Sequence, residues 1–182
     1  MICVDASVAV KWVVEEERSD QATVLYNAVL SAGRAIVAPP LLPIEVTNIL
    51  LRRTRSADRW PLDLATARLE RFLDLPIAIH NPDDLHSRAL ALAHAFDLPA
   101  AYDAHYLALA ETLGCELWTD DERLWRRVES RVPLVRRLSD YSLPAAGSSP
   151  WSASSGCRRL SPPIRTTATS MSASSPSCST RI

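Results

Sequence analysis

The sequence is poor in cysteine and has no long uninterrupted apolar run. Four cysteines among 182 residues are too few and too scattered for a disulfide framework, and none forms a CxxC or Cys/His zinc pattern. We therefore expect inert thiols. The apolar stretch at the N-terminus is interrupted by Glu15, Glu16 and Glu17, and it has neither a basic leader nor a small-residue cleavage site. It predicts neither a membrane span nor a secretory signal, so a cytoplasmic protein without a membrane partner is expected.

A general excess of positive charge is also lacking. The whole chain has a net charge of −1, and residues 1–143 alone hold 16 basic and 21 acidic side chains, a net charge of −5. Strongly basic composition, the usual electrostatic footprint of nucleic-acid binding, is therefore absent. Any contact with RNA must depend on local arginines and on cations that offset clustered carboxylates.

Composition changes abruptly near Pro144. Residues 144–182 are rich in Ser, Pro and Thr and carry four arginines but no acid. This segment has no apolar periodicity with which to offset the entropy of ordering, so we expect a disordered tail over 144–182 and one globular domain over 1–143.

Within residues 1–143, apolar β-rich runs alternate with helical patterns. The expected strands are 1–5, 34–39, 76–81, 115–119 and 133–138. The expected helices are 7–14, 19–32, 41–53, 62–73, one that begins at Asn81–Pro82 and carries apolar residues to Phe96, 101–113, and 121–129. Such alternation is typical of an α/β fold with a parallel sheet covered on both faces, and the ligand site of such a sheet lies beyond the carboxyl ends of its strands.

Acidic residues recur where these strands end or these helices begin. Asp5 closes the first strand, Glu45 lies early in an apolar helix, Asp103 begins another helix, and the Asp120–Asp121 doublet follows the fourth strand. Each has a structural explanation, because Asp caps helices and acids near a helix N-terminus are favoured by its dipole. Thr119 and Glu122 likewise have the spacing of a capping box.

Taken together, these acids indicate a metal site, which no single acid among them would indicate. Carboxylates brought together repel one another unless a cation intervenes, and oxygen ligands without a His/Cys set favour Mg²⁺ or Mn²⁺. Acid-lined sites that hold such ions typically carry out phosphoryl chemistry. Glu45 in an apolar helix implies a cation or a hydrogen-bonding partner, for which Asn48, one turn later, is a candidate. His105 is expected to be packed or solvated rather than a ligand.

Four segments in order resemble the PIN-domain family, especially its VapC-type toxins. They are "VDASVAVKWVV", "PPLLPIEVTNIL", "LPAAYDAHYLALAETLG" and "LWTDDERL", and they span nearly all of residues 1–143. The resemblance implies a PIN-like three-layer α/β/α sandwich with a central, mostly parallel sheet. It places the acidic quartet of the family at Asp5, Glu45, Asp103 and Asp121, as both metal ligands and catalytic residues.

The resemblance also implies an activity and partners. A metal-dependent endoribonuclease would hold Mg²⁺ or Mn²⁺ on the quartet, activate a bound water for in-line attack on a phosphodiester, and leave a 5′-phosphate and a 3′-hydroxyl. Ser7 and Thr119 match small hydroxyl residues that order the metal site. A toxin of a toxin–antitoxin pair would act on an RNA substrate, bind a cognate antitoxin and form a homodimer.

RNA contacts require positive or stacking groups outside the acids. The arginine candidates are Arg52, Arg53, Arg55, Arg59, Arg123, Arg126 and Arg127, for which a solvated helix face is the alternative. The tryptophans Trp12, Trp60, Trp118 and Trp125 offer stacking surfaces, but core or dimer packing is the stronger expectation for most of them.

Three other functions are compatible with parts of this pattern. A non-catalytic binding module with a vestigial acidic pocket is the main alternative, although the complete quartet argues against it. A phosphotransfer receiver would need an Asp after the third strand and a late Lys, whereas the strand ends at His80 and the only lysine is Lys11. A haloacid-dehalogenase-type phosphatase would need an acid where Ser7 stands.

Overall fold

Five short parallel strands form the centre of the protein in the computed structural model, which describes residues 1–57 and 59–142. The strands are β1 (Ile2–Val4), β2 (Ile36–Ala38), β3 (Ile77–Ile79), β4 (Glu116–Thr119) and β5 (Val135–Arg137), in the spatial order β3-β2-β1-β4-β5. All five lie within the segments predicted as strands. The tail expected to be disordered, 144–182, lies outside the described residues.

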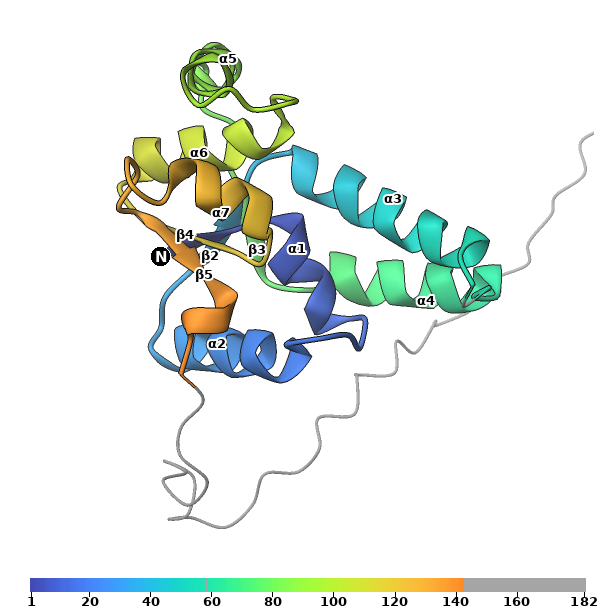
Figure 1. Cartoon of the computed structure of the whole chain (residues 1–182). Helices are drawn as coiled ribbons and strands as arrows, with labels where there is room; N and C mark the ends of the chain where they lie inside the picture. The colour runs from blue at the N-terminus through green and yellow to red at the C-terminus, as the bar shows by residue number, and fades with distance from the viewer. Residues whose placement is uncertain (58, 143–182) are drawn as a thin grey trace, which may run out of the picture. The chain divides into compact units, whose positions relative to one another are not determined.

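Helices connect each strand to the next. They are α1 (Ala6–Ala9), the 3-10 helix η1 (Val10–Trp12), α2 (Ser19–Ser31), α3 (Leu41–Arg55), α4 (Leu62–Leu73), α5 (Leu85–Ala95), α6 (Tyr102–Leu113), α7 (Glu122–Val128) and the 3-10 helix η2 (Leu138–Asp140). Figure 1 shows α2 on one side of the sheet and α5 and α6 on the other, which gives three α/β/α layers. The antiparallel pair of α3 and α4 projects from the carboxyl end of the sheet.

The order of the strands reverses beside β1. From β1 the chain moves outward to β2 and β3, and it then crosses the sheet to pair β4 with the other edge of β1. Right-handed crossovers that run in opposite directions place their helices on opposite faces of the sheet. The loops that follow β1 and β4 therefore turn to opposite faces and leave a space between them at the carboxyl end. This switch point, between Val4 and Thr119, is where the fold leaves room for a site.

The caps at three helix starts differ from those that the sequence suggests. Helix α2 begins at Ser19, as expected, but its N-cap position is held by Arg18, in a left-handed conformation with φ 64°, and not by Ser19 itself, a residue type common at that position. The residue that precedes α5 is Asp84 rather than Asn81, and α7 is capped by Asp121 rather than by a Thr119–Glu122 box. At the other end of α6, Gly114 ends the helix in the left-handed region with φ 59°, as a C-terminal glycine is expected to.

Packing inside the protein accounts for two of the four cysteines and for two of the tryptophans. Cys3 and Cys115 are buried and unpaired, and burial raises the pKa of the Cys3 thiol well above its usual value, which makes it a poor nucleophile. Trp12 packs on Tyr26, and Trp118 is buried against Tyr141. These tryptophans therefore pack in the protein, as expected. In the described part of the chain, no helix is long and apolar enough to cross a membrane.

Candidate metal centre at the switch point

Asp5 lies at the centre of the site, in the turn between β1 and α1. Its side chain caps α1 by accepting a hydrogen bond from the Val8 amide at 3.1 Å, and only 5% of the residue is exposed. Burial raises the pKa of Asp5 to about 7, although hydrogen bonds from Ser7, Thr119 and the Val8 amide favour the ionised form. The predicted cap is thus real, but a cap alone does not explain why the carboxylate is held so deep.

Two hydroxyl groups connect Asp5 to the loop after β4. Ser7 Oγ donates to Asp5 Oδ1 at 2.6 Å and accepts from the Asp120 amide at 2.7 Å. Thr119 Oγ1 donates to Asp5 Oδ2 at 2.5 Å and accepts from the Asp121 amide at 2.9 Å. Both carboxylate oxygens are therefore fixed through hydroxyls to successive backbone amides of one loop, which sets the position of the doublet relative to Asp5.

Glu45 reaches the site from α3. Tyr106 on α6 donates its hydroxyl to Glu45 Oε2 at 2.5 Å, so Tyr106, and not Asn48, is the hydrogen-bonding partner that the buried acid required. Burial raises the pKa of Glu45, while the Tyr106 hydrogen bond and the nearby charges of His105 and Arg52 lower it. This contact ties α3 to the helix that carries Asp103.

Asp103 occupies the first turn of α6 and interacts with the other acids. Burial, together with the charges of Asp121 and Glu45, raises the pKa of Asp103 to about 6. Asp103 in turn raises the pKa of Asp5. Among residues 1–57 and 59–142, no hydrogen bond or ion pair engages the Asp103 carboxylate, which makes it the least compensated of the four acids.

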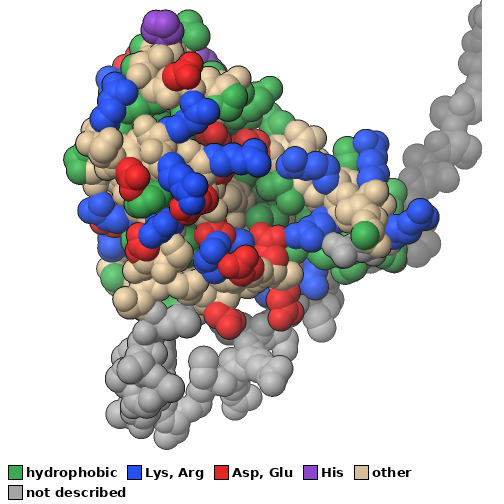
Figure 2. Space-filling view, viewed as in Figure 1, with side chains coloured by type: hydrophobic (Ala, Val, Ile, Leu, Met, Phe, Trp, Pro, Cys, Tyr) green, Lys and Arg blue, Asp and Glu red, His purple; other side chains and the backbone are tan. Residues whose placement is uncertain are grey.

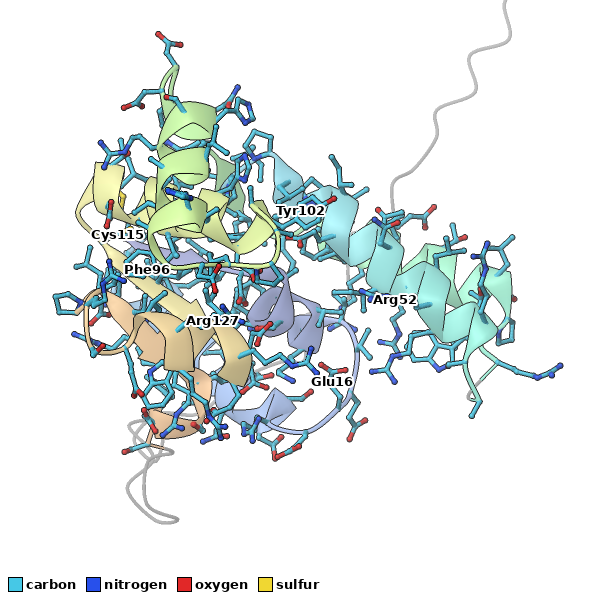
Figure 3. The ribbon with its side chains drawn as sticks, turned by 45° about the horizontal axis from the view of Figure 1, so that its top comes forward. Glu16, Arg52, Phe96, Tyr102, Cys115 and Arg127 are labelled. Atoms are coloured by element: carbon cyan, nitrogen blue, oxygen red, sulfur yellow. The ribbon has the colours of Figure 1, made fainter. Side chains whose placement is uncertain are left out.

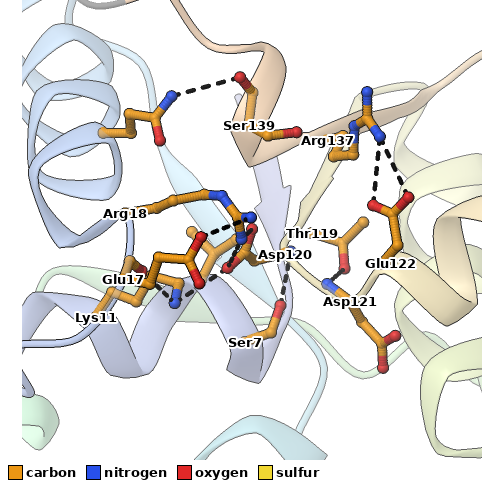
Figure 4. A network of polar contacts seen from close by, with 12 residues as sticks. Ser7, Lys11, Glu17, Arg18, Thr119, Asp120, Asp121, Glu122, Arg137 and Ser139 are labelled. Carbon is orange, nitrogen blue, oxygen red and sulfur yellow. Dashed lines mark hydrogen bonds and ion pairs between the residues drawn. The ribbon is translucent and has the colours of Figure 1, made fainter.

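The two acids of the doublet point in different directions. Asp121 caps α7 through Oδ1, which accepts from the amides of Arg123 and Leu124 at 2.7 and 3.2 Å. Asp120 instead binds Lys11 Nζ at 3.1 Å and Arg18 Nη1 at 2.9 Å. Figure 4 shows these two cations converging on Asp120 while the Asp121 side chain points to the opposite side. Asp121 is therefore the member of the doublet that is coupled to Asp103.

The ion-pair network around Lys11 is a feature that the sequence analysis missed. Lys11 is 7% exposed, and its Nζ donates to Glu16 at 2.9 Å and to the Glu17 carbonyl at 2.8 Å in addition to its pair with Asp120. Arg53 on α3 pairs with the other oxygen of Glu16. The available signal was a single lysine within the apolar segment "SVAVKWVV", because a buried ammonium requires acidic partners.

The four predicted acids are of the ligand type that a hard cation prefers, but they do not form a closed metal-binding cage. In the described residues, no three His, Cys, Asp or Glu side chains are gathered closely enough to hold a metal ion as they stand. The donors are nonetheless all carboxylate oxygens, and the pKa of Asp103 is raised by two of its neighbours. A partly buried carboxylate that has no donor and faces other carboxylates is a group that a divalent cation would stabilise.

The candidate RNA-contacting arginines divide into two groups. Arg53, Arg126 and Arg127 form ion pairs with Glu16, Glu122 and Asp97. In the described chain, the side chains of Arg52, Arg55, Arg59 and Arg123 form no hydrogen bond or ion pair, and all four are exposed. On the face seen in Figure 2, basic and acidic side chains are interspersed rather than segregated, in agreement with the net charge of −5 for residues 1–143.

Comparisons with known proteins match this architecture. Residues 2–130 match the family model of the PIN domain. Ribonuclease VapC3 of Pyrobaculum aerophilum is 34% identical over 136 residues, which are 72% of this chain and 97% of that protein.

Two solved structures share the fold. One is VapC20 of Mycobacterium tuberculosis, described as a toxin that cleaves the sarcin–ricin loop, with a TM-score of 0.53 and 18% identity over 70% of this chain and 95% of that one. The other is VapBC2 of Rickettsia felis, bound to a DNA fragment from its promoter, with a TM-score of 0.55 and 12% identity over 75% of this chain and 98% of that one.

Proposed function

Because the chain belongs to the PIN-domain family, we propose that it is a metal-dependent endoribonuclease that acts as the toxin of a toxin–antitoxin pair. The family membership and the ribonuclease relative support hydrolysis of RNA phosphodiester bonds. The coupled acids at the switch point support the dependence on Mg²⁺ or Mn²⁺.

The observation that carries the proposal is the uncompensated Asp103 carboxylate. Its pKa is raised to about 6 by burial and by the charges of Asp121 and Glu45. A structural acid in the first turn of a helix needs no acidic neighbours, and an unmatched set of acids destabilises the fold. We infer that Asp5, Glu45, Asp103 and Asp121 are retained together because they hold a cation and a phosphate.

Each residue of the site has a distinct role in the proposal. A bound Mg²⁺ or Mn²⁺ supplies a Lewis acid that lowers the pKa of water and stabilises charge on phosphoryl oxygens. Ser7 and Thr119 hold both oxygens of Asp5 in a fixed orientation. Tyr106 favours the ionised form of Glu45 by donating to it, because this hydrogen bond opposes the rise in the pKa of Glu45 that burial causes.

The proposed partners follow from the relatives. The similarity to VapC proteins and to the VapBC2 structure supports a cognate antitoxin that covers the site. We also retain the homodimer as a hypothesis. A non-catalytic binding module is the alternative from another functional class, and it would retain the fold and any affinity for RNA without metal-dependent cleavage.

The test combines RNA cleavage with metal binding. Purified protein freed of any antitoxin is incubated with structured cellular RNAs in Mg²⁺, in Mn²⁺ or in EDTA, beside Asp103→Asn. The expected result is discrete cleavage by the wild type that EDTA abolishes and that Asp103→Asn lowers by more than about 100-fold. Within residues 1–57 and 59–142, the Asp103 carboxylate accepts no hydrogen bond that the replacement would break. Asp74→Asn, at the exposed C-terminal end of α4, is the matched control.

A thermal readout separates a lost ligand from a lost fold. Mn²⁺ at a hundred times its Kd stabilises a single-site protein by about 2.7 kcal/mol. We expect Mn²⁺ to raise the melting temperature of the wild type and of Asp74→Asn but not that of Asp103→Asn. Cleavage that persists in Asp103→Asn would indicate a contaminant or a different site. Folded, metal-loaded protein that cuts no RNA would favour the binding module.

A further inference from the structure

An open groove runs along α3 beside the acidic site. Its volume is about 600 Å³, which is within the range of about 300–1,000 Å³ that is typical of small-ligand sites. The residues that matter here are Glu45, Asn48, Arg52 and Arg55 on one stripe of α3, with Tyr102 at the start of α6. We call this feature the α3 groove. The opposite stripe of α3 is buried in the core through Leu42, Val46 and Leu50.

The side chains of the α3 groove carry polar groups that the described protein does not use. Arg52, Arg55, Asn48 and Tyr102 form no hydrogen bond or ion pair within residues 1–57 and 59–142. Arg53, the neighbour of Arg52 on α3, lies outside the groove and is paired with Glu16. The groove therefore presents two uncommitted guanidinium groups, an amide and an aromatic ring.

The α3 groove leads directly to the acids. Glu45 belongs both to the groove and to the quartet, and the charge of Arg52 lowers the pKa of Glu45. Tyr102 precedes Asp103 in the chain and is 60% exposed. Figure 3 shows Tyr102 beside the first turns of α3, with Arg52 farther along the same helix. A polymer that places a phosphate at the quartet can thus continue along α3 past both side chains.

We propose that the α3 groove is a binding subsite for a single-stranded segment of RNA, in which Tyr102 stacks on a base and Arg52 and Arg55 contact phosphates. This inference rests on the proposed function, because it concerns the same site. Single-stranded RNA offers unstacked base faces to aromatic side chains, whereas the bases of a duplex are covered by their neighbours. The proposal assigns substrate affinity to residues distinct from the acids.

Charge favours RNA over a protein as the occupant. Residues 1–143 have a net charge of −5, yet the α3 groove has two arginines against the single acid Glu45. Exposed apolar side chains such as Ile44 also line it, and these would serve a second copy of the chain equally well. The two exposed guanidinium groups, however, are donors suited to anions, and phosphates spaced along a strand supply such anions.

The first arm of the test measures stacking. A fluorescein-labelled single-stranded oligoribonucleotide of mixed sequence is titrated in EDTA, and its binding is followed by fluorescence anisotropy. Tyr102→Ala is expected to weaken binding by about 5- to 150-fold, the equivalent of one lost base stack, while Tyr102→Phe retains the wild-type affinity. Because Tyr102 is exposed, both variants should melt at the wild-type temperature.

The second arm measures phosphate contacts. Arg52→Gln is expected to lower the slope of log K against log salt by about 0.7, the value for one phosphate of a single strand. Arg71→Gln, on the exposed part of α4 and outside the groove, is the matched control and should leave the slope unchanged. Cleavage in Mn²⁺ and sedimentation velocity are measured on the same proteins.

The outcomes separate this inference from the proposed function. Binding that depends on Tyr102 and Arg52 in a protein that cleaves nothing would retain the subsite and overturn the nuclease. Unchanged affinity of Tyr102→Ala overturns the subsite even if the wild type cleaves RNA. The absence of RNA binding by the wild type in the anisotropy titration also overturns it. If Tyr102→Ala or Arg52→Gln loses self-association but keeps its affinity for RNA, the groove is an interface between copies of the chain. This result would also overturn the proposed subsite.

Discussion

The surroundings of Asp5 have opposite effects on the pKa of its carboxyl group. Burial raises its pKa, whereas both oxygens accept hydrogen bonds that favour the carboxylate. Its pKa of about 7 in the folded protein exceeds the ordinary value of 3.8. Between these two values the folded state holds a proton on Asp5 that the unfolded chain has already lost. Asp5 therefore makes the free energy of unfolding depend on pH.

The sign of this dependence follows from linkage. Below about pH 4 Asp5 is protonated in both states, and the stabilisation due to its raised pKa is fully present; it is lost as the pH rises to about 7. We expect the free energy of unfolding of the wild type to fall, relative to that of Asp5→Asn, by at most about 4 kcal/mol across this interval. Urea unfolding in EDTA at several pH values measures it.

The matched variant for this measurement is Asp74→Asn, which changes an exposed carboxyl and should follow the wild type. Parallel pH profiles for the wild type and Asp5→Asn would show that the protein does not hold Asp5 in the environment described here. The comparison depends on slopes with pH, so a constant offset caused by rearranged hydrogen bonds does not affect it.

At the scale of elements, the Lys11 network joins η1, the loop that precedes α2, and the loop after β4. Lys11 and Asp120 are both largely buried, and each has further charged partners in Glu16 and Arg18. Breaking a buried ion pair by removing one partner is strongly destabilising, because the remaining charge is left in a poorly solvated place. The network therefore fixes the loop that carries Asp121.

We expect Lys11→Met to lower the free energy of unfolding by about 3 kcal/mol. Lys11→Met combined with Asp120→Asn should lower it by less than the sum of the single changes, since the pair interacts directly. Urea unfolding of the four proteins in this cycle measures the coupling. Arg126→Gln, which breaks an exposed pair, should remain close to the wild type, and additive effects of Lys11→Met and Asp120→Asn would contradict the network.

The strands and most helices could be predicted from the sequence because their signal is local. Strands buried on both faces read as continuous apolar runs, as in "MICVD" and "CELWT". The acids could be assigned to the end of the sheet because parallel strands end at one edge. The charges of Asp121 and Glu45 raise the pKa of Asp103, while the roles of the four acids in metal binding and catalysis stay a prediction.

The remaining features depend on contacts between distant residues. Thr119 has the spacing of a capping residue, but its hydroxyl is used by Asp5, 114 residues away, so Asp121 caps α7 instead. The left-handed backbone of Arg18 is accompanied by a side chain that binds Asp120, 102 residues away. No local pattern records such partners, which is why the directions in which Asp120 and Asp121 point could not be predicted from residue spacing.

On the scale of the whole molecule, the sheet has a protected centre and exposed edges. The residues of β1 are completely buried and pair on both sides, whereas β3 pairs only with β2 and is largely exposed. We expect the amides of β1 to exchange with solvent only through global unfolding and those of β3 to exchange through local opening. Native-state hydrogen exchange in low denaturant measures both.

The control for hydrogen exchange is internal, because β1 and β2 share a ladder and should respond alike to denaturant. Exchange of β1 that is independent of denaturant, or protection of β3 equal to that of β1, would contradict a sheet organised around the switch point. The result also tests the placement of the site, since Asp5 and Thr119 directly follow or end the two central strands.

The hydroxyl links between Asp5 and the loop after β4 determine when the site can form during synthesis on the ribosome. Asp5 emerges first, but Thr119 and the amides of Asp120 and Asp121 are synthesised more than a hundred residues later. A nascent chain that stops before this loop lacks Asp121, the Thr119 hydroxyl that binds Asp5, and the two amides that fix the hydroxyls of Ser7 and Thr119. The four acids therefore cannot take up the arrangement seen in the folded protein until residue 121 has been synthesised and has left the ribosome.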